Sequence, residues 1–166
     1  MSTPFPKNNS VQIAENSILD YFNKQTYLGN SFSLSSGTIT FGDTLENPKI
    51  LITNASQKGF FFYYRNAGSS AQFYARFYLN PTVTGNGTPA TPMNLRPAYQ
   101  TASVASAFTG PTISVNGALI TNMSCSDALV QSGLMFIIDP GSKLLVTAQS
   151  TGGSGTGYVE MAWYEL

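Results

Sequence analysis

The chain has 166 residues, of which 42% are hydrophobic and only 10% are charged, well below the roughly 25% typical of soluble domains. Eight acidic and eight basic residues give a formal net charge of zero, so we expect neither nucleic acid nor an anionic membrane as a partner. The sequence has no histidine and one cysteine, Cys125, which excludes Ser-His-Asp and Cys-His nucleophile systems, an internal disulfide and zinc sites built from these residues.

Neither the start of the sequence nor its apolar runs predict targeting to a membrane. Residues 1–7 lack the basic region and the following apolar run of a secretory signal. The longest apolar runs, such as residues 60–64, fall far short of the roughly 20 residues that cross a bilayer. We therefore expect synthesis in a cytoplasm.

Residues 1–25 differ from the rest of the chain, because they begin with two prolines and an Asn-Asn-Ser cluster. The spacing of three apolar residues between 18 and 22 favours one or two helical turns. We predict a partly extended arm over residues 1–25 that either packs along its own domain or reaches a neighbouring subunit. Its candidate partner contacts are Phe5 and Ile13.

From residue 26 onward the hydrophobic pattern is that of β-strands. Residues 31–35 and 38–41 alternate polar and apolar side chains, as half-buried strands do, and residues 49–53 form a short buried strand. Residues 60–65 are apolar on both faces. Such a strand needs cover on both sides, either at the centre of a sandwich or against another subunit.

Residues 73–79 show the clearest alternation in the chain. One face is apolar and predicts a core contact: Phe73, Ala75, Phe77 and Leu79. The other face is amphipathic: Tyr74, Arg76 and Tyr78. Together with Tyr99 these three residues are candidate partner contacts, because Tyr and Arg are enriched in binding hot spots. The alternative is that they only cover the sheet.

Further strands are expected at residues 103–108, 112–115, 134–138, 143–148 and 158–164. About ten short strands separated by Gly, Pro and Asn, without a helical period after residue 25, indicate an all-β fold. We predict an antiparallel β-sandwich with jelly-roll-like topology over residues 26–166. Immunoglobulin-like wiring remains the alternative.

One short segment occurs twice in the sequence. Residues 81–87, Pro-Thr-Val-Thr-Gly-Asn-Gly, are echoed by residues 111–117, Pro-Thr-Ile-Ser-Val-Asn-Gly. Both end in Asn-Gly, a pair that tolerates the positive φ of a tight turn. We expect the two segments to occupy comparable places in the fold.

The remaining polar residues do not form a recognisable catalytic or cofactor site. The glycine-rich residues 152–157 lack the lysine and the helix of a phosphate-binding loop. Glu160 and Glu165 fall on opposite faces of one strand, and Asp43 and Glu46 share a loop where solvation or turn capping explains them. Calcium binding by loop carboxylates stays open but no spaced acidic motif supports it. We predict a non-enzymatic module without a cofactor.

Part of the chain resembles virion proteins of tailed bacteriophages. In those proteins a strand ends in an Asn-Pro-Thr-like turn, followed by an Asn-Gly-Thr and a Thr-Pro-x-Asn-Leu segment, as in residues 78–95 of this sequence. The similarity continues at residues 103–105, 110–113, 140–146 and 160–165. It covers about residues 40–166 and not the arm. Because it consists of turn residues on strands, no catalytic residue comes with it.

The resemblance implies a capsid decoration, cement or head-fibre-like protein, usually an oligomeric β-sandwich. Its expected location is the virion, and its expected partners are the major capsid protein and its own copies, with a trimer favoured over a dimer. The alternative is a receptor-binding or glycan-binding module of a tail fibre or spike. In that case residues 80–94 and 152–157 would contact the glycan.

Overall fold

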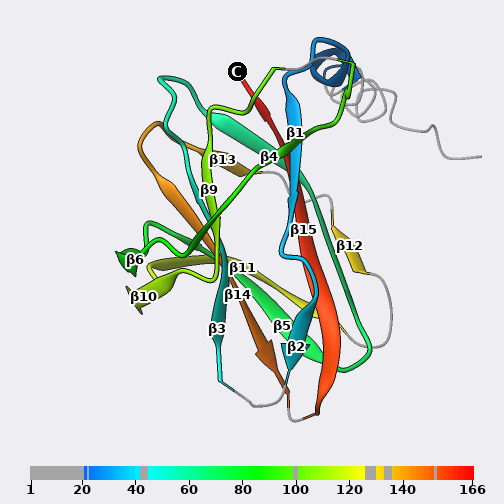
Figure 1. The fold of residues 1–166 in the computed structure, drawn as a ribbon, viewed down its shortest axis with the longest axis vertical. Coiled ribbons are helices and arrows are strands. Elements are labelled where there is room, and N and C mark those ends of the chain that lie inside the picture. The colour runs from blue at the N-terminus through cyan, green and yellow to red at the C-terminus, as the bar shows by residue number, and fades with distance from the viewer. Residues whose placement is uncertain are drawn as a thin grey trace, which may run out of the picture.

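The computed structural model describes residues 21, 23–41, 45–98, 101–125, 130–132, 136–151 and 153–166. Within these ranges the fold is almost entirely strands, which confirms the all-β prediction (Figure 1). Residue 21 and residues 23–27 are helical and cross the predicted end of the arm at residue 25. The remaining part of the predicted arm, with Phe5 and Ile13, lies outside the described residues.

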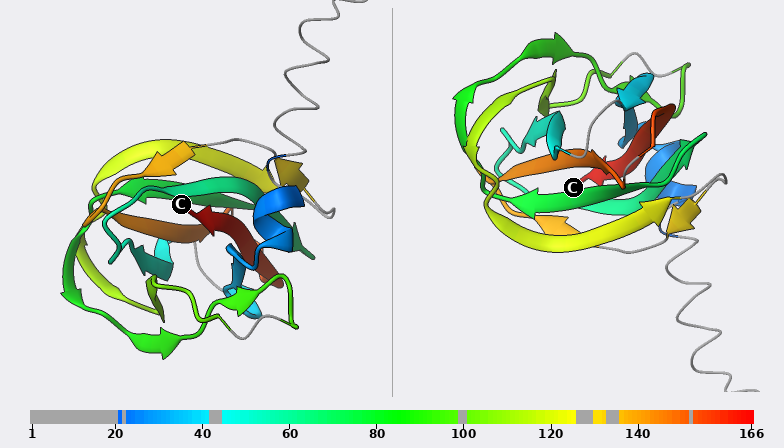
Figure 2. Two further views of the ribbon diagram at one scale, coloured as in Figure 1. Left: turned by 90° about the horizontal axis from the view of Figure 1, so that it is seen from above. Right: turned by 90° about the horizontal axis from the view of Figure 1, so that it is seen from below.

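Two antiparallel sheets pack face to face, and the end-on views show them as two curved layers (Figure 2). The first sheet has the order β12 (Val130–Ser132), β4 (Phe60–Ser69), β15 (Gly155–Glu165), β1 (Ser31–Ser35) and β8 (Met93–Asn94). In addition, β13 (Phe136–Ile138) pairs with β4 and β2 (Ile39–Phe41) pairs with β15.

The second sheet has the order β11 (Ala118–Cys125), β5 (Phe73–Leu79), β14 (Lys143–Ser150), β3 (Asn47–Thr53), β9 (Ser106–Thr109) and β7 (Thr88–Ala90). A separate ribbon joins β6 (Thr82–Gly85) to β10 (Thr112–Val115). In Figure 1 this ribbon lies to one side of the sandwich.

The strand order is that of a jelly roll. Taken in chain order, β1, β3, β4, β5, β11, β12, β14 and β15 form the four-stranded arrays β1-β15-β4-β12 and β3-β14-β5-β11. This is the interleaved order that two Greek keys produce, and it excludes the immunoglobulin-like alternative. The strands β6 to β10 are an insertion between β5 and β11, and they widen one sheet by β9 and β7 and the other by β8.

The core lies between the two sheets and is built from alternate residues of each strand. Trp163 is fully buried, with its ring 5.3 Å from that of Phe62 and 6.3 Å from that of Phe32. On β5, Phe73, Ala75 and Phe77 are fully buried, which confirms the predicted core face at these three positions, whereas Leu79 is only partly buried.

Residues 60–62 of the aromatic strand β4 are covered on both faces of the sheet by their own chain. Phe60 and Phe62 point into the core, and the ring of Phe61 on the opposite face stacks on that of Tyr164 at 4.9 Å. β4 also lies inside its sheet, between β15 and the pair β12 and β13. For residues 60–62 the centre of a sandwich, one of the two covers that the sequence left open, is therefore observed.

Several strands were not predicted from the sequence. The insertion contains β6, β7 and β8, which are only two to four residues long, and β11 and β12 follow it. Other boundaries differ: β4 continues to Ser69, and β9 begins at Ser106 rather than at residue 103. Residues 134 and 135 of one predicted strand lie outside the described residues, and its remainder is β13.

The two copies of the repeated segment, residues 81–87 and 111–117, pair with each other. β6 and β10 form an antiparallel ribbon in which Val83 lies opposite Ile113, its counterpart in the other copy. The neighbouring contacts come in equivalent pairs: Thr112 opposite Gly85 and Val115 opposite Thr82, and hydroxyl donation from Thr84 to Thr112 O (3.2 Å) and from Ser114 to Thr82 O (3.3 Å). The ribbon therefore has a local twofold relation, which we call the pseudo-twofold.

The pseudo-twofold extends into the six-stranded sheet. It exchanges β5 with β9, β7 with β11 and β3 with β14, so that the equivalent residues Leu51 and Leu145 lie opposite each other at its centre. The equivalence holds for single hydrogen bonds at the strand ends: Asn80 N–H donates to Lys143 O at 2.8 Å, and Gly110 N–H donates to Lys49 O at 3.0 Å. The repeated sequence thus marks a repeated structure.

A glycine ends each copy, and the backbone leaves no room for any other residue. Gly87 and Gly117 have φ values of +86° and +90°. A Cβ on Gly87 would lie 2.3 Å from Thr109 O, and one on Gly117 would lie 2.2 Å from Leu79 O. Each copy therefore packs its glycine directly on the backbone that leads into the other copy.

Candidate functional site

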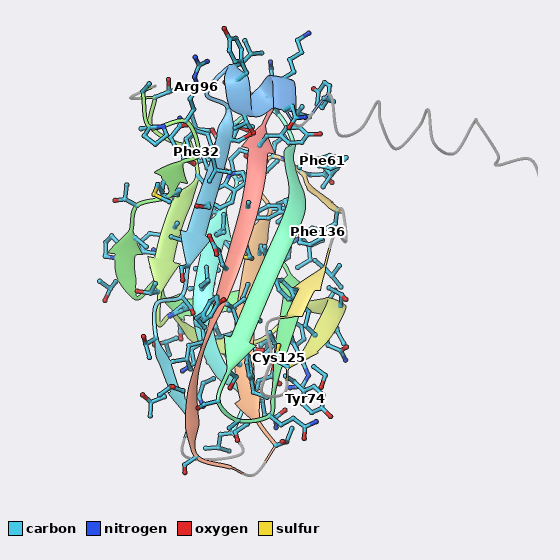
Figure 3. The ribbon with its side chains drawn as sticks, turned by 90° about the vertical axis from the view of Figure 1, so that its right-hand side faces the viewer. Phe32, Phe61, Tyr74, Arg96, Cys125 and Phe136 are labelled. Carbon is cyan, nitrogen blue, oxygen red and sulfur yellow. The ribbon has the colours of Figure 1, made fainter. Side chains whose placement is uncertain are left out.

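Of the six predicted contact residues, the structure describes three. Tyr74, Arg76 and Tyr78 lie side by side along one face of β5, and all three are half-buried. Phe5, Ile13 and Tyr99 lie outside the described residues. Figure 3 shows Tyr74 near the end of the sandwich opposite to the helical residues.

The face of β5 is organised around one carboxylate, Glu46. Its Oε2 lies 3.2 Å from Nη1 of Arg76, and its Oε1 accepts a hydrogen bond from the hydroxyl of Tyr78 at 2.9 Å and another from the hydroxyl of Thr147. Arg76 also donates to the side chain of Gln149. Instead of a solvated or turn-capping position in its loop, Glu46 thus joins β5 to β14.

The charged side chains on this face have partners within the chain. Arg76 lies 5.4 Å from the centre of the Tyr74 ring, while its charge is balanced by Glu46. Burial raises the pKa of Tyr78, and the hydrogen bond and the charge of Glu46 act in the same direction. The face therefore presents neutral aromatic and polar surface and not a charged patch.

A second candidate surface, which we call the apical cluster, belongs to segments that hydrogen bonds join beside the helical residues and the C-terminal strand. Figures 1 and 2 show the backbone at this end of the sandwich. Its members are large apolar side chains, each between 45% and 68% exposed: Tyr27, Leu28, Met93, Val104 and Leu166. They come from four segments that are distant in the sequence. Exposed large apolar side chains on neighbouring segments are typical of a contact surface.

Hydrogen bonds tie the four segments of the apical cluster together. Asn94 Nδ2 donates to Gly29 O at 2.8 Å and to Thr101 O at 3.1 Å, and Val104 N–H donates to Glu165 Oε2 at 3.1 Å. The exposed side chains therefore sit on a connected framework.

Arg96 adds a further link to this framework. Its guanidinium lies 4.2 Å from the centre of the Tyr27 ring and donates to the carbonyl of Tyr27 (Figure 3 labels Arg96). A guanidinium stacked on one face of an aromatic ring holds that ring in place. Tyr27 nevertheless remains 68% exposed.

An aromatic stack joins the helical residues to the sheet. The rings of Tyr21 and Tyr164 pack edge to face with their centres 5.4 Å apart, and Tyr164 is stacked on Phe61. Burial, and to a smaller degree Tyr21, raises the pKa of Tyr164 to about 12, so this phenol is neutral at physiological pH. The stack therefore holds Tyr21 against the sheet.

The apical cluster was missed because nothing in the sequence marks it. Its members lie at the end of the helical residues, in loop positions, in a two-residue strand and at the C-terminus, so they show no periodicity. Only Tyr27-Leu28 before Gly-Asn is an apolar pair beside a turn, and such pairs are common in buried positions too.

Nucleophile and metal chemistry find little support in the described part of the chain. No group of three or more Cys, Asp or Glu residues there could hold a metal ion. Cys125 is buried, and this burial raises the pKa of its thiol to about 11. Glu165 accepts hydrogen bonds from Ser103 and from Trp163 Nε1, and it joins the C-terminal strand to a loop. Among the helical residues described, none belongs to a helix long and apolar enough to cross a membrane.

Comparisons with known proteins do not place the chain in a family. No protein-family model matches it, and no curated protein matches its sequence. Among solved structures, one similar chain is from the structure of infectious bursal disease virus, Gx strain. The identity is 12%, the match covers 81% of this chain and 40% of the viral chain, and the TM-score is 0.16. A likeness at that TM-score carries no argument.

Proposed function

We propose that this chain is a virion structural protein that decorates or cements a phage capsid, binding the major capsid protein and its own copies. The observation that supports this proposal is the apical cluster, an exposed apolar surface on a hydrogen-bonded framework. Exposure of large apolar side chains to water is unfavourable in free energy, and their burial in a complex is favourable.

The low charge of the chain suits repeated contacts in an assembly. With a net charge of zero, many copies can sit close together on a shell without mutual repulsion. Weak contacts from each copy add up when two binding segments act together. A subunit that touches two neighbouring capsomers would raise the free energy needed to separate them.

The predicted arm joins the sandwich at the same end as the apical cluster. Tyr21, the first described residue, contacts Tyr164 beside the C-terminus, and the helical residues continue to Tyr27 of the cluster. In the proposed mechanism residues 1–20 and the apical cluster bind the same capsid surface, one on each side of a joint between capsomers.

The test is co-sedimentation of the purified chain with empty phage shells. We expect Tyr27→Ser combined with Leu28→Ser to weaken shell binding about tenfold or more, because two exposed apolar contacts are lost. The matched control is Leu45→Ser, which removes a side chain of similar exposure (67%) just before β3. Equal binding by both variants would contradict a role for the apical cluster.

Deletion of residues 1–20 tests the arm separately. A loss of shell binding with an unchanged melting temperature would support its part in docking. Unchanged binding would remove the arm from the mechanism and leave the apical cluster to act alone.

One observation favours the second candidate, a receptor- or glycan-binding module. The Tyr27 ring is exposed and held by Arg96, and such a ring can stack on a sugar. The predicted glycan loops fit less well, because much of residues 80–94 is paired in β6, β7 and β8. Binding to a glycan array that Tyr27→Ser abolishes, without binding to shells, would favour this candidate.

A further inference from the structure

The pseudo-twofold makes the two outer strands of the six-stranded sheet, β7 and β11, equivalent to each other. Pro89 of β7 lies opposite Phe108, and Leu119 of β11 lies opposite Tyr78, which is the counterpart of Phe108. The same position is therefore occupied by proline on one edge and by leucine on the other.

Proline at this position reveals which way the backbone N–H points. Proline has no N–H, yet Pro89 remains paired with β9, so the strand does not need a hydrogen bond from this residue toward its neighbour. By the pseudo-twofold, the N–H of Leu119 points away from β5 and out of the sheet. Among the described strands, none pairs with β11 on that outer side.

The two edges differ in how they are protected. Proteins guard exposed edges with proline, charged residues, bulges or cover. β7 has Pro89, and Pro92 follows it, whereas β11 has the sequence Ala-Leu-Ile-Thr-Asn-Met-Ser-Cys, with neither proline nor charge. A bulge between Leu119 and Thr121 is the protection that β11 shows. At this bulge the side chain of Leu119 is 54% exposed.

We propose that the β11 edge pairs antiparallel with β11 of a second copy of this chain, so that two six-stranded sheets join across a twofold axis. An antiparallel pairing of identical strands sets each residue against a residue of the same segment, which an uncharged strand allows without repulsion. The exposed side chain of Leu119 in each copy is covered in the contact. The inference rests on the part of the proposed function that has copies bind one another, and it selects a dimer over the trimer expected from the sequence.

The test is sedimentation velocity of the full chain without any capsid, from about 1 to 100 µM. The wild-type chain is expected to sediment as a dimer in this range. Leu119→Pro places on β11 the residue that β7 carries at the equivalent position, and we expect dimer affinity to fall at least about tenfold with an unchanged melting temperature. Leu119→Thr keeps the N–H and should weaken the dimer less.

Three results would overturn the inference: a wild-type monomer throughout the range, a trimer, or a folded Leu119→Pro variant with wild-type association. If Leu119→Pro lowers the melting temperature, Leu119→Lys is the variant that tests the inference. It keeps the backbone N–H but places a positive charge on the β11 edge of both copies, which should weaken the dimer. Binding to shells is measured separately. A dimer that does not bind shells would contradict the capsid proposal alone, and a monomer that binds them would contradict the β11 inference alone.

Discussion

The two halves of the pseudo-twofold share a backbone but differ in their side chains. In the half around β5 and β6, Tyr78 and Arg76 meet Glu46 in a polar network. In the half around β9 and β10, the equivalent residues are Phe108 and Ser106. Residues that the backbone geometry requires are therefore repeated in both halves, and residues that only cover a face have diverged.

The positions at the turns show which requirements are strict. Both halves keep the proline that starts the segment and the Asn-Gly pair that ends it. The left-handed residue before the proline is free to vary between Asn80, with φ of +53°, and Gly110, with φ of +60°. A close approach of two backbones thus fixes the residue type, and a positive φ alone does not.

The largest effect is expected from filling that close approach. Gly117→Ala and Gly87→Ala should each destabilise the fold by roughly 3 kcal/mol, because the methyl group meets a carbonyl oxygen at a strained φ. Urea unfolding measures this loss. The control is Gly110→Ala, which has positive φ but nothing within 4 Å of its Cβ, and which should cost about 1 kcal/mol. Equal losses in all three variants would contradict the packing argument.

The next largest effect should come from the carboxylate that only one half possesses. Glu46→Gln removes the charge beside Arg76 and weakens the hydrogen bonds from Tyr78 and Thr147, so we expect a loss of about 1.5 kcal/mol. The free energy of unfolding at pH 7 tests this value. Asp139→Asn, at an exposed carboxylate, is the control and should change stability by less than about 0.5 kcal/mol.

Tyr78→Phe makes the first half resemble the second, which has Phe108 at the same place. The variant loses the hydrogen bond to Glu46 and should be about 1 kcal/mol less stable at pH 7. In Glu46→Gln the same substitution should cost less, since the two residues share one interaction. A full additive loss in the double variant would show that Tyr78 acts by other contacts.

The contribution of Tyr78 should also depend on pH, whereas Phe108 cannot titrate. Because burial and Glu46 raise the pKa of Tyr78 above the ordinary value for tyrosine, about 10, the folded protein holds this proton more tightly than the unfolded chain. The resulting stability is present below pH 10 and is lost as the pH rises above it. We therefore expect the wild type and Tyr78→Phe to differ most below pH 10 and to converge above it, as unfolding curves would show.

Much of the fold could be predicted from the sequence, because strict alternation of apolar and polar residues in a long strand shows which residues face the core. β5 is the best example, since Phe73 and Phe77 are buried and Tyr74 lies on the opposite face, as the pattern predicts. The short strands of the insertion carry too few residues to show a period, and the bulge in β11 breaks its alternation. The hydrophobic pattern of the sequence therefore predicted the sandwich but not the short strands of the insertion or the edge strand β11.

The sites were less predictable, because their contacts depend on strand order. Glu46, which precedes β3, contacts Arg76 of β5 because only β14 separates the two strands. No residue spacing in the sequence predicts this strand order. The apical cluster likewise needs the jelly-roll wiring to bring Tyr27 near the C-terminus. By contrast, the repeated Pro…Asn-Gly segment correctly predicted that its two copies occupy equivalent places in the fold, because turn geometry selects residue types locally.

The smallest effect is expected where the two halves can exchange residues. Gly110→Asn installs the residue that Asn80 provides in the other half, where its Oδ1 accepts the N–H of Lys143 at 3.0 Å. Because asparagine tolerates a left-handed backbone and no atom lies within 4 Å of the new Cβ, stability should change by less than about 0.5 kcal/mol. Gly110→Val, whose branched side chain is strained at φ of +60°, should lose about 2 kcal/mol in the same urea titration. If both variants lose the same amount, Gly110 and Asn80 are not equivalent, and the pseudo-twofold then describes the ribbon but not the strands that lead into it.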